Sequence, residues 1–344
     1  MSKVSMSMVP TLLALALAGC GGGSGSGASP APAGATALTI TSTNSKPLTA
    51  DAIENAAGGD AAQVGASLVT GVQVDAGGAA GAAPQLAAVA QKLASMVPAS
   101  ASVATGVAIN TTVNCSGGGS LTLSGNVSGG SGMVAGDDVT ISAANCKETV
   151  GGVLETMSGT LRLQITAGSV VDTTHYPYHV VMSIKATNFS IASSGVSNAT
   201  DGDLTLDMTA NSATSQVSVL TSTSLSNNTT DSRGTRGATL KNYKQTQTLQ
   251  GTSSNSDVTA TVESTNSRLG TGAVKYDLTT PTPLVTNTST GAYTAGSMKI
   301  VGANSSLLVT VTGSNTFSIQ VDANGDGIYE ASSTATLTEL KALL

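Results

Sequence analysis

The densest group of acidic and glycine residues in this chain is VDANGDGIYE, at residues 321–330. Oxygen-bearing side chains recur there at every second position, interrupted only by an isoleucine whose backbone carbonyl can stand in for one. Carboxylate, amide and carbonyl oxygens are the ligands that Ca²⁺ prefers, and Gly327 allows the sharp turn that such a loop needs. The pattern predicts a candidate structural calcium site whose ligands are Asp322, Asn324, Asp326, Ile328 and Glu330.

This D-x-N-x-D-G series resembles the strand-flanked calcium loops of integrin-type propeller blades, over these few residues only and without implying the propeller fold. It departs from an EF-hand. The closing glutamate is replaced by Ser333, and a strand-like segment, TFSIQV, stands where the entering helix would be. The alternative is a plain hairpin turn, because Asn-Gly and Asp-Gly pairs are frequent hairpin signals.

The only two histidines, His175 and His179, lie in DTTHYPYH and offer little catalytic chemistry. On a strand, residues four apart are separated by about 13 Å, which is too far for both to bind one metal ion. Pro177 argues against a helix that would bring them together. A serine hydrolase would need a histidine base, and no G-x-S-x-G elbow is present. We therefore predict that the protein is not an enzyme and has no catalytic residues.

The first twenty residues, MSKVSMSMVPTLLALALAGC, have the layout of a secretory signal. The apolar run after Lys3 is too short to cross about 30 Å of hydrocarbon. It ends on residues that resemble the lipobox of bacterial lipoproteins, namely Leu17, Ala18, Gly19 and Cys20. The resemblance implies cleavage after residue 19, acylation of Cys20 (palmitate is a typical chain) and anchoring in the membrane. Since Gly21 rather than aspartate follows, it implies the outer membrane, with the periplasmic or surface face left open.

The other two cysteines, Cys115 and Cys146, close two similar phrases, TTVNC and SAANC. These phrases predict the ends of two strands in one sheet. Two cysteines in an exported chain most simply form a disulfide, which would stabilise the fold by about 3 to 4 kcal/mol. A redox-active pair is the alternative, but there is no C-x-x-C spacing to favour it.

The chain divides into four predicted parts. Residues 1–19 form a signal peptide, 20–38 a flexible Gly/Ser/Pro tether, 39–103 an Ala/Gly-rich segment with short helices and 104–344 an antiparallel β domain. One helix is expected in TADAIENAAGG, capped at Thr49. A second is expected in PQLAAVAQKLASMVP, with Pro84 at its first position and an apolar stripe of Leu86, Val89, Leu93 and Met96.

From about residue 104 the apolar residues alternate with polar ones. TLRLQIT, DLTLDMT, DVTATVE and TFSIQVD each predict a strand with one buried face. One solvated face favours antiparallel pairing, and polar glycine-rich connections such as SNATDGD, which contains Asp201 and Asp203, predict the turns of a meander. The basic residues from Arg233 to Lys275 are expected on a solvated strand face.

The predicted fold is mainly β: an antiparallel meander that forms a curved sheet or half-open barrel, with one or two short N-terminal helices in its concavity. At the level of architecture this resembles the open barrels of bacterial lipoprotein-carrier proteins. The alternative is a β-sandwich.

The formal net charge of −6 and the absence of tryptophan argue against nucleic acid as a partner and against stacking on sugars or bases. Two functional readings remain. In the first, an outer-membrane lipoprotein carries a non-catalytic binding or structural domain of the cell envelope. In the second, the curved sheet holds a lipid or other apolar ligand that the protein carries or senses. They differ over whether the helix residues fill the concavity. The only partner that the sequence predicts is the membrane, which the N-terminal lipid would bind.

Overall fold

The computed structural model describes residues 34–55, 81–95, 97, 107–128, 132–150, 153–170, 176–193 and 195–344. The predicted signal peptide, most of the tether, the lipidation residue Cys20, Met96 of the apolar stripe and His175 lie outside these ranges.

The described residues form fifteen named strands and three helices. The helices are α1 (Ser45–Asn55), α3 (Ala82–Ser95) and α4 (Leu337–Lys341). The strands are β1 (Thr36–Ala37), β2 (Val107–Asn114), β3 (Ser120–Val127), β4 (Asp138–Val150), β5 (Val153–Gly168), β6 (Tyr178–Ser193), β7 (Val196–Ser212), β8 (Ser215–Asp231), β9 (Gly234–Gln250), β10 (Ser253–Ser264), β11 (Val274–Asn287), β12 (Ala292–Val301), β13 (Ser306–Gly313), β14 (Thr316–Asp322) and β15 (Ala331–Thr336).

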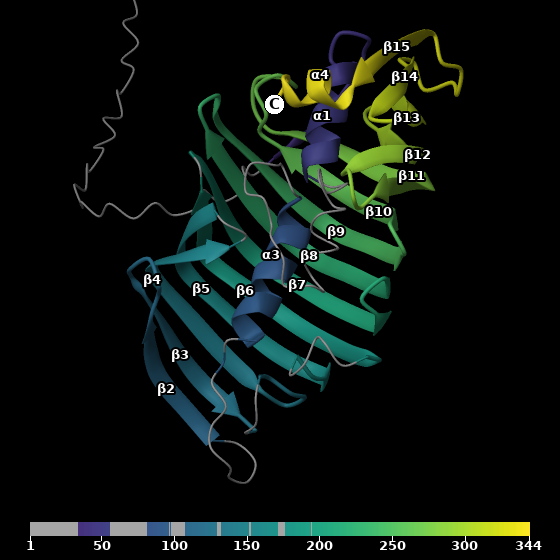
Figure 1. The fold of residues 1–344 in the computed structure, drawn as a ribbon. Coiled ribbons are helices and arrows are strands. Elements are labelled where there is room, and N and C mark those ends of the chain that lie inside the picture. The colour runs from purple at the N-terminus through teal and green to yellow at the C-terminus, as the bar shows by residue number, and fades with distance from the viewer. Residues whose placement is uncertain are drawn as a thin grey trace, which may run out of the picture.

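All strands belong to one sheet. From β2 to β15 each strand lies beside the next in the sequence, and these neighbours are antiparallel. The two-residue β1 pairs in parallel with β11. The sheet is open, with β2 at one edge and β15 at the other, and Figure 1 shows it curving around α3. The predicted curved meander is therefore confirmed. The alternative of a sandwich is wrong, because there is no second sheet among the described strands.

The period of two puts the apolar side chains on one face of this sheet. On β5, Leu161, Leu163 and Ile165 are buried, whereas Arg162 between them is exposed. The same alternation runs along β10, where every second residue from Ser254 to the end of the strand is buried. A single sheet with one apolar face needs a cover from elsewhere in the chain.

Helix α3 supplies part of that cover. It packs against β5, β7 and β8 across the concave face (Figure 1). The predicted stripe is only partly right. Leu86 and Leu93 are buried and Val89 is partly exposed, but the alanines on the other sides of the helix are buried as well. The helix is thus enclosed almost all round, which is what small alanine side chains permit. Its side chains also meet the sheet through Gln85, whose Oε1 accepts from Asn198.

A row of irregular pairings crosses the middle of the sheet. Each of Asn145, Asn188 and Asn242 has a positive φ, and each lies at a shift in the strand register on β4, β6 and β9. Gly159 on β5 and Gly202 on β7 continue the row, also with positive φ. β-Bulges bend a strand and increase its twist. Bulges aligned across neighbouring strands bend the whole sheet along one line, which gives the concavity that holds α3.

Three local predictions were wrong in their boundaries. Helix α3 begins at Ala82, so Pro84 is its third residue and not its first. SNATDGD is not a turn but part of β7, because the Asp-Gly signal marks the bulge at Gly202 rather than a reversal of the chain. Helix α1 begins at Ser45, before the expected cap at Thr49, whose hydroxyl instead donates to the Ser45 carbonyl at 2.8 Å. By contrast, the last helix begins with a capping box in which Thr336 and Glu339 bond to each other's backbone.

The bulge row predicts unequal effects of adding one methyl group at two glycines. Gly159 and Gly195 both have a positive φ, so alanine strains both. At Gly159 the new Cβ would also lie 2.0 Å from the Asn188 carbonyl oxygen, whereas at Gly195 nothing lies within 4 Å. We expect Gly159→Ala to lower the free energy of unfolding by at least about 2 kcal/mol more than Gly195→Ala. Chemical denaturation measures both variants. Equal losses would show that the close strand contact at the bulge is not required.

Candidate functional site

The candidate calcium loop connects the last two strands of the sheet. β14 ends at Asp322, which lies opposite Ser306 of β13, and β15 begins at Ala331. Gly325 and Gly327 have positive φ values of 77° and 86°, which let the chain turn twice within the loop. The strand expected before the loop is therefore present, and the sheet holds both ends of the loop in place.

Asp322, at the end of β14, holds the backbone of the loop through its carboxylate. Its side chain is buried, and it accepts hydrogen bonds from the backbone N–H groups of Gly325 at 2.7 Å and Gly327 at 3.1 Å. The Ser306 hydroxyl donates to it at 3.3 Å. Burial opposes the charged form of Asp322, but these donors outweigh it and hold the pKa of the carboxyl below its usual value. Asp322 is therefore a carboxylate at neutral pH.

The other four predicted ligands are exposed. Asn324 and Asp326 bond to each other, Nδ2 to Oδ2 at 3.1 Å, and each also accepts a backbone N–H. Glu330 reaches back across the loop and accepts the Ala323 N–H at 2.9 Å. Ile328 is 68% exposed. The loop is thus closed by its own hydrogen bonds, as a plain turn would be.

The same arrangement gathers negative charge. Oxygens of Asp322, Asp326 and Glu330 all lie within 4.8 Å of one another. Two oxygens bound to one Ca²⁺ at 2.3 to 2.6 Å can lie up to about 5 Å apart, so this spacing suits the ion. The structure brings together three of the five predicted ligands. The Asn324 amide is engaged with Asp326, and Ile328 would contribute only its carbonyl.

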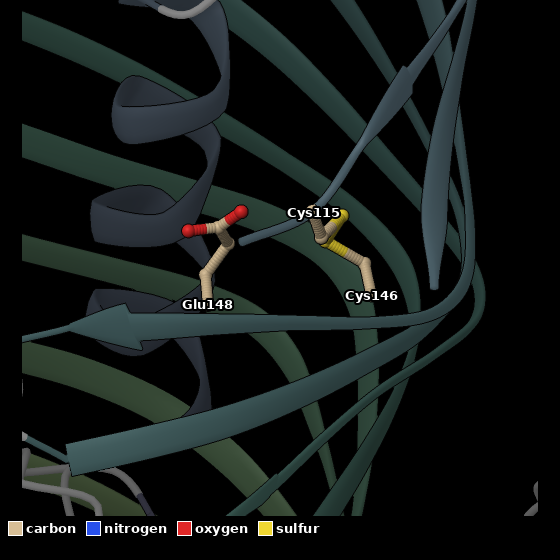
Figure 2. A group of neighbouring side chains, drawn as sticks. All are labelled: Cys115, Cys146 and Glu148. Atoms are coloured by element: carbon tan, nitrogen blue, oxygen red, sulfur yellow. A yellow bond between two sulfur atoms is a disulfide. The ribbon is translucent and has the colours of Figure 1, made fainter. Parts of the chain in front are cut away.

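The predicted cysteine pair lies at disulfide distance, with the two sulfur atoms 2.00 Å apart. Cys115 follows β2 directly, but Cys146 lies inside β4 beside the bulge at Asn145, so the prediction of two strand ends is wrong for the second cysteine. A Glu148 oxygen lies within 4.8 Å of both sulfurs (Figure 2). Sulfurs that are joined to each other have no thiolate to offer a metal, so this cluster is structural.

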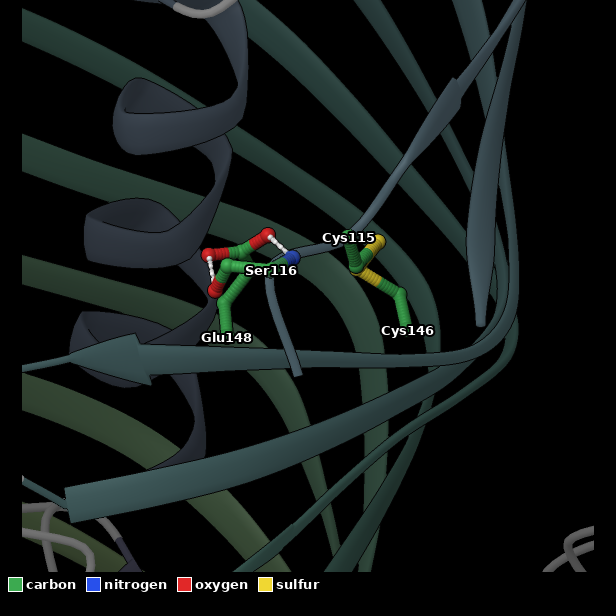
Figure 3. Close-up of a disulfide and its surroundings, with 4 residues drawn as sticks. All are labelled: Cys115, Ser116, Cys146 and Glu148. Atoms are coloured by element: carbon green, nitrogen blue, oxygen red, sulfur yellow. Dashed lines mark hydrogen bonds between the residues drawn. A yellow bond between two sulfur atoms is a disulfide. The ribbon is translucent and has the colours of Figure 1, made fainter. Parts of the chain in front are cut away.

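The disulfide joins the turn between β2 and β3 to β4. The Ser116 N–H and hydroxyl both donate to the Glu148 carboxylate at 2.7 Å, as Figure 3 shows. Two backbone bonds add to this contact: the Gly117 N–H donates to the Lys147 carbonyl, and the Lys147 N–H donates to the Gly118 carbonyl. The turn is therefore fixed to β4 by covalent, charged and backbone contacts together.

His179 lies on the outer face of the sheet. Its Nε2 is 2.9 Å from the Asp207 carboxylate on β7, and both side chains are about half exposed. Asp201 accepts the Asn188 N–H at the bulge, and Asp203 bonds to Thr223 on β8. These acids serve strand contacts instead of forming an acid and base pair around a cleft.

A buried acid that the sequence did not predict joins α1 to the sheet. The Asp51 carboxylate is 1% exposed and accepts from Ser264, Asn266 and Tyr276 at 3.0, 3.1 and 2.8 Å. Burial raises the pKa of Asp51 to about 6, even though the three donors favour its charged form. The partners lie more than 200 residues away in the chain, so no local pattern could reveal them.

A chain of ion pairs begins one turn further along α1. Glu54 pairs with Arg236 of β9, with Nε and Oε2 2.9 Å apart, and Arg236 also pairs with Asp231 at 2.9 Å. Asp231 binds Arg233, whose guanidinium donates to the Lys341 carbonyl of α4. The hydrogen bonds from Arg233, followed by those from Arg236, hold the pKa of Asp231 well below its usual range. The expectation of a solvated basic face is therefore wrong for Arg236, whose side chain is only 11% exposed.

No described helix is long and apolar enough to span a membrane. No protein-family model, curated protein or solved structure matches the chain.

The loop predicts a response to calcium. If Ca²⁺ binds the three carboxylates, millimolar calcium should raise the melting temperature of the wild-type protein, because the ion binds the folded loop and relieves the repulsion there. The control is Asp322→Ala, Asp326→Ala, which removes two ligands, compared under the same calcium and under matched magnesium. An equal shift in melting temperature in wild type and double variant would show that residues 322–330 form only a turn.

The buried acid predicts a change in stability with pH. The folded-state pKa of about 6 lies above the ordinary value of 3.8, so the folded protein holds the carboxyl proton of Asp51 more tightly than the unfolded chain does. The protonated carboxyl of Asp51 therefore stabilises the folded state. This contribution is fully present below the unfolded pKa and is lost as pH rises through about 6. Asp51→Asn stays neutral throughout. Between pH 4 and pH 7 we expect wild type to lose about 2 kcal/mol of unfolding free energy relative to this variant. Denaturant titrations that stay parallel across this range would contradict the assignment.

Proposed function

We propose that the protein is an outer-membrane-anchored lipoprotein whose β domain acts without catalysis, as a binding or structural module of the cell envelope. The observation that carries the proposal is the position of α3 inside the curved sheet. The helix occupies the space in which a carrier protein would hold its ligand, and its own side chains are the contents of that space.

The packing of α3 supports this reading. Leu86 and Leu93 are each 2% exposed, and four alanines of the helix, Ala83, Ala87, Ala90 and Ala94, are fully buried. Facing them on the sheet are apolar residues such as Leu206 and Met208, which are also buried. Full burial of a leucine side chain contributes about 1.5 to 3 kcal/mol, so withdrawing the helix to admit a ligand would be costly. The concavity is a core instead of an open groove.

The polar groups support an absence of catalysis. His179 is paired with an exposed aspartate on the convex face, and the strand acids are engaged by neighbouring backbone and hydroxyl groups. The buried acid Asp51 belongs to α1 and accepts three hydrogen bonds from the sheet side of the helix, away from solvent. Each of these groups has a contact that explains it within the fold.

The anchor is argued from the residues around Cys20. Acyl chains contribute about 0.8 kcal/mol per buried methylene, so the several chains of a lipoprotein hold it firmly. As a flexible chain, the Gly/Ser-rich residues between Cys20 and β1 would have a root-mean-square reach of about 20 to 25 Å, enough to hold the β domain off the lipid surface. An anchored domain with a closed core presents its convex face and its two edges to other molecules.

The anchor predicts a change in membrane partitioning. Cys20→Ser removes the sulfur that would be acylated, so we expect the variant to move from the detergent phase and the membrane fraction into the soluble fraction. Cys115→Ser, Cys146→Ser is the matched control, because it removes sulfur elsewhere and should leave partitioning unchanged. Detergent partitioning of Cys20→Ser that equals wild type would refute the anchor.

The filled concavity predicts what purifies with the domain. Organic extraction of the Cys20→Ser protein, followed by mass spectrometry, should yield no lipid in molar proportion to the protein. Native mass spectra should show the mass of the polypeptide alone. Repeated recovery of one lipid per chain would favour a carrier or sensor of an apolar ligand over the proposed function.

A further inference from the structure

Strand β2 forms an open edge of the sheet. It pairs with β3 alone, over Val107–Asn114, and the register of the two strands has no shift. Residues 110–114 are all exposed, and so is Ala108. The disulfide and the Glu148 contacts hold the turn at one end of this hairpin against β4. The edge is therefore both accessible and fixed in shape.

The backbone groups that point out of the sheet can be assigned from one hydrogen bond. The Cys115 N–H donates to the Gly119 carbonyl, so Cys115 faces β3. In an antiparallel strand the N–H and C=O of one residue point to the same side, and the side alternates along the chain. The residues that direct both groups to the open edge are therefore Ala108, Asn110, Thr112 and Asn114.

The core face of the sheet is buried at β3 but exposed to solvent at β2. On β3, Leu121 and Leu123 are 2% and 3% exposed. Their partners on β2 lie on the same face, yet Val113 is 38% exposed and Thr111 is exposed as well. Ile109, next in that row, is only partly buried against the core. β2 thus carries apolar side chains on the core face that the described chain leaves uncovered.

Natural sheets protect their edges with charged residues, proline, bulges or short strands. β2 has none of these: it is eight residues long, its sequence VAINTTVN is uncharged, and β3 beside it is uncharged too. The opposite edge is shorter. β15 has six residues and runs directly into α4.

We propose that β2 pairs antiparallel with β2 of a second copy of this chain, about a two-fold axis through Thr111, so that two sheets become one. In this register Ala108 bonds to Asn114 of the second copy, and Asn110 bonds to Thr112. Ile109 then lies opposite Val113 on the core face, and Thr111 lies opposite itself. Uncharged strands favour a second copy over a charged peptide, and a two-fold pairing leaves no β2 edge open.

Two edge variants test this pairing in the full chain carrying Cys20→Ser, which excludes the lipid and the third cysteine. Thr111→Lys places two ammonium groups face to face at the axis. Thr112→Pro removes an N–H that points away from β3, so the bonds of β2 to β3 remain. Thr187→Lys, an exposed β6 position on the same sheet, adds the same charge away from the edge. Sedimentation measures the dissociation constant of each protein.

We expect a wild-type dimer, a dissociation constant raised at least about tenfold in both edge variants, and no change in Thr187→Lys. Thr111→Cys should form a disulfide between two copies on mild oxidation, whereas Thr112→Cys should not, because only residue 111 meets itself. Circular dichroism melts show whether each variant folds. A wild-type monomer up to submillimolar concentration would overturn the proposal, as would a dimer that survives both edge variants. Assembly beyond two copies would mean that β2 pairs with another edge, and would also overturn it.

Discussion

The fold depends on one constraint: a single open sheet has an apolar face, and the chain must cover that face from within. A flat sheet would contact a helix along one side only. The aligned bulges at Asn145, Asn188 and Asn242 bend the sheet, so that β5, β7 and β8 can all reach α3. Alanine is the suitable residue for such a helix, because small side chains let strands approach from several directions at once.

The two ends of the described chain are held by polar contacts buried beside that core. α1 lies on the sheet through Asp51 and Glu54, and α4 joins it through the Arg233 bond to Lys341 and through the apolar residues Leu337 and Leu340, which line a small hollow with Ile53. Breaking a buried pair leaves an uncompensated charge, so removing either Glu54 or Arg236 would destabilise the position of α1 on the sheet. The covalent bond at Cys115 does the same for the β2–β3 turn.

Local pattern predicts much of this architecture. The alternation of apolar and polar residues in TLRLQIT and its counterparts is a signal with a period of two, so the strands and the class of the sheet follow from the sequence. The Asp-Gly pair at Gly202 predicts a turn where the structure has a bulge, because turns and bulges need the same residue types. The Asp51 cluster could not be predicted, since its partners are brought together only by the completed fold. In the calcium loop, sequence spacing predicts the three converging carboxylates, but not that Asn324 would bond to Asp326.

The central claim is that α3 is part of the core and not an occupant that leaves. Native-state hydrogen exchange tests it most directly, since a helix that opens separately exchanges faster than the strands around it. The account predicts that the amides from Leu86 to Leu93 exchange as slowly as those of β6 to β8, through global unfolding alone. Amides of α3 that exchange orders of magnitude faster than those strands would contradict it, and would show a helix that swings out of the sheet.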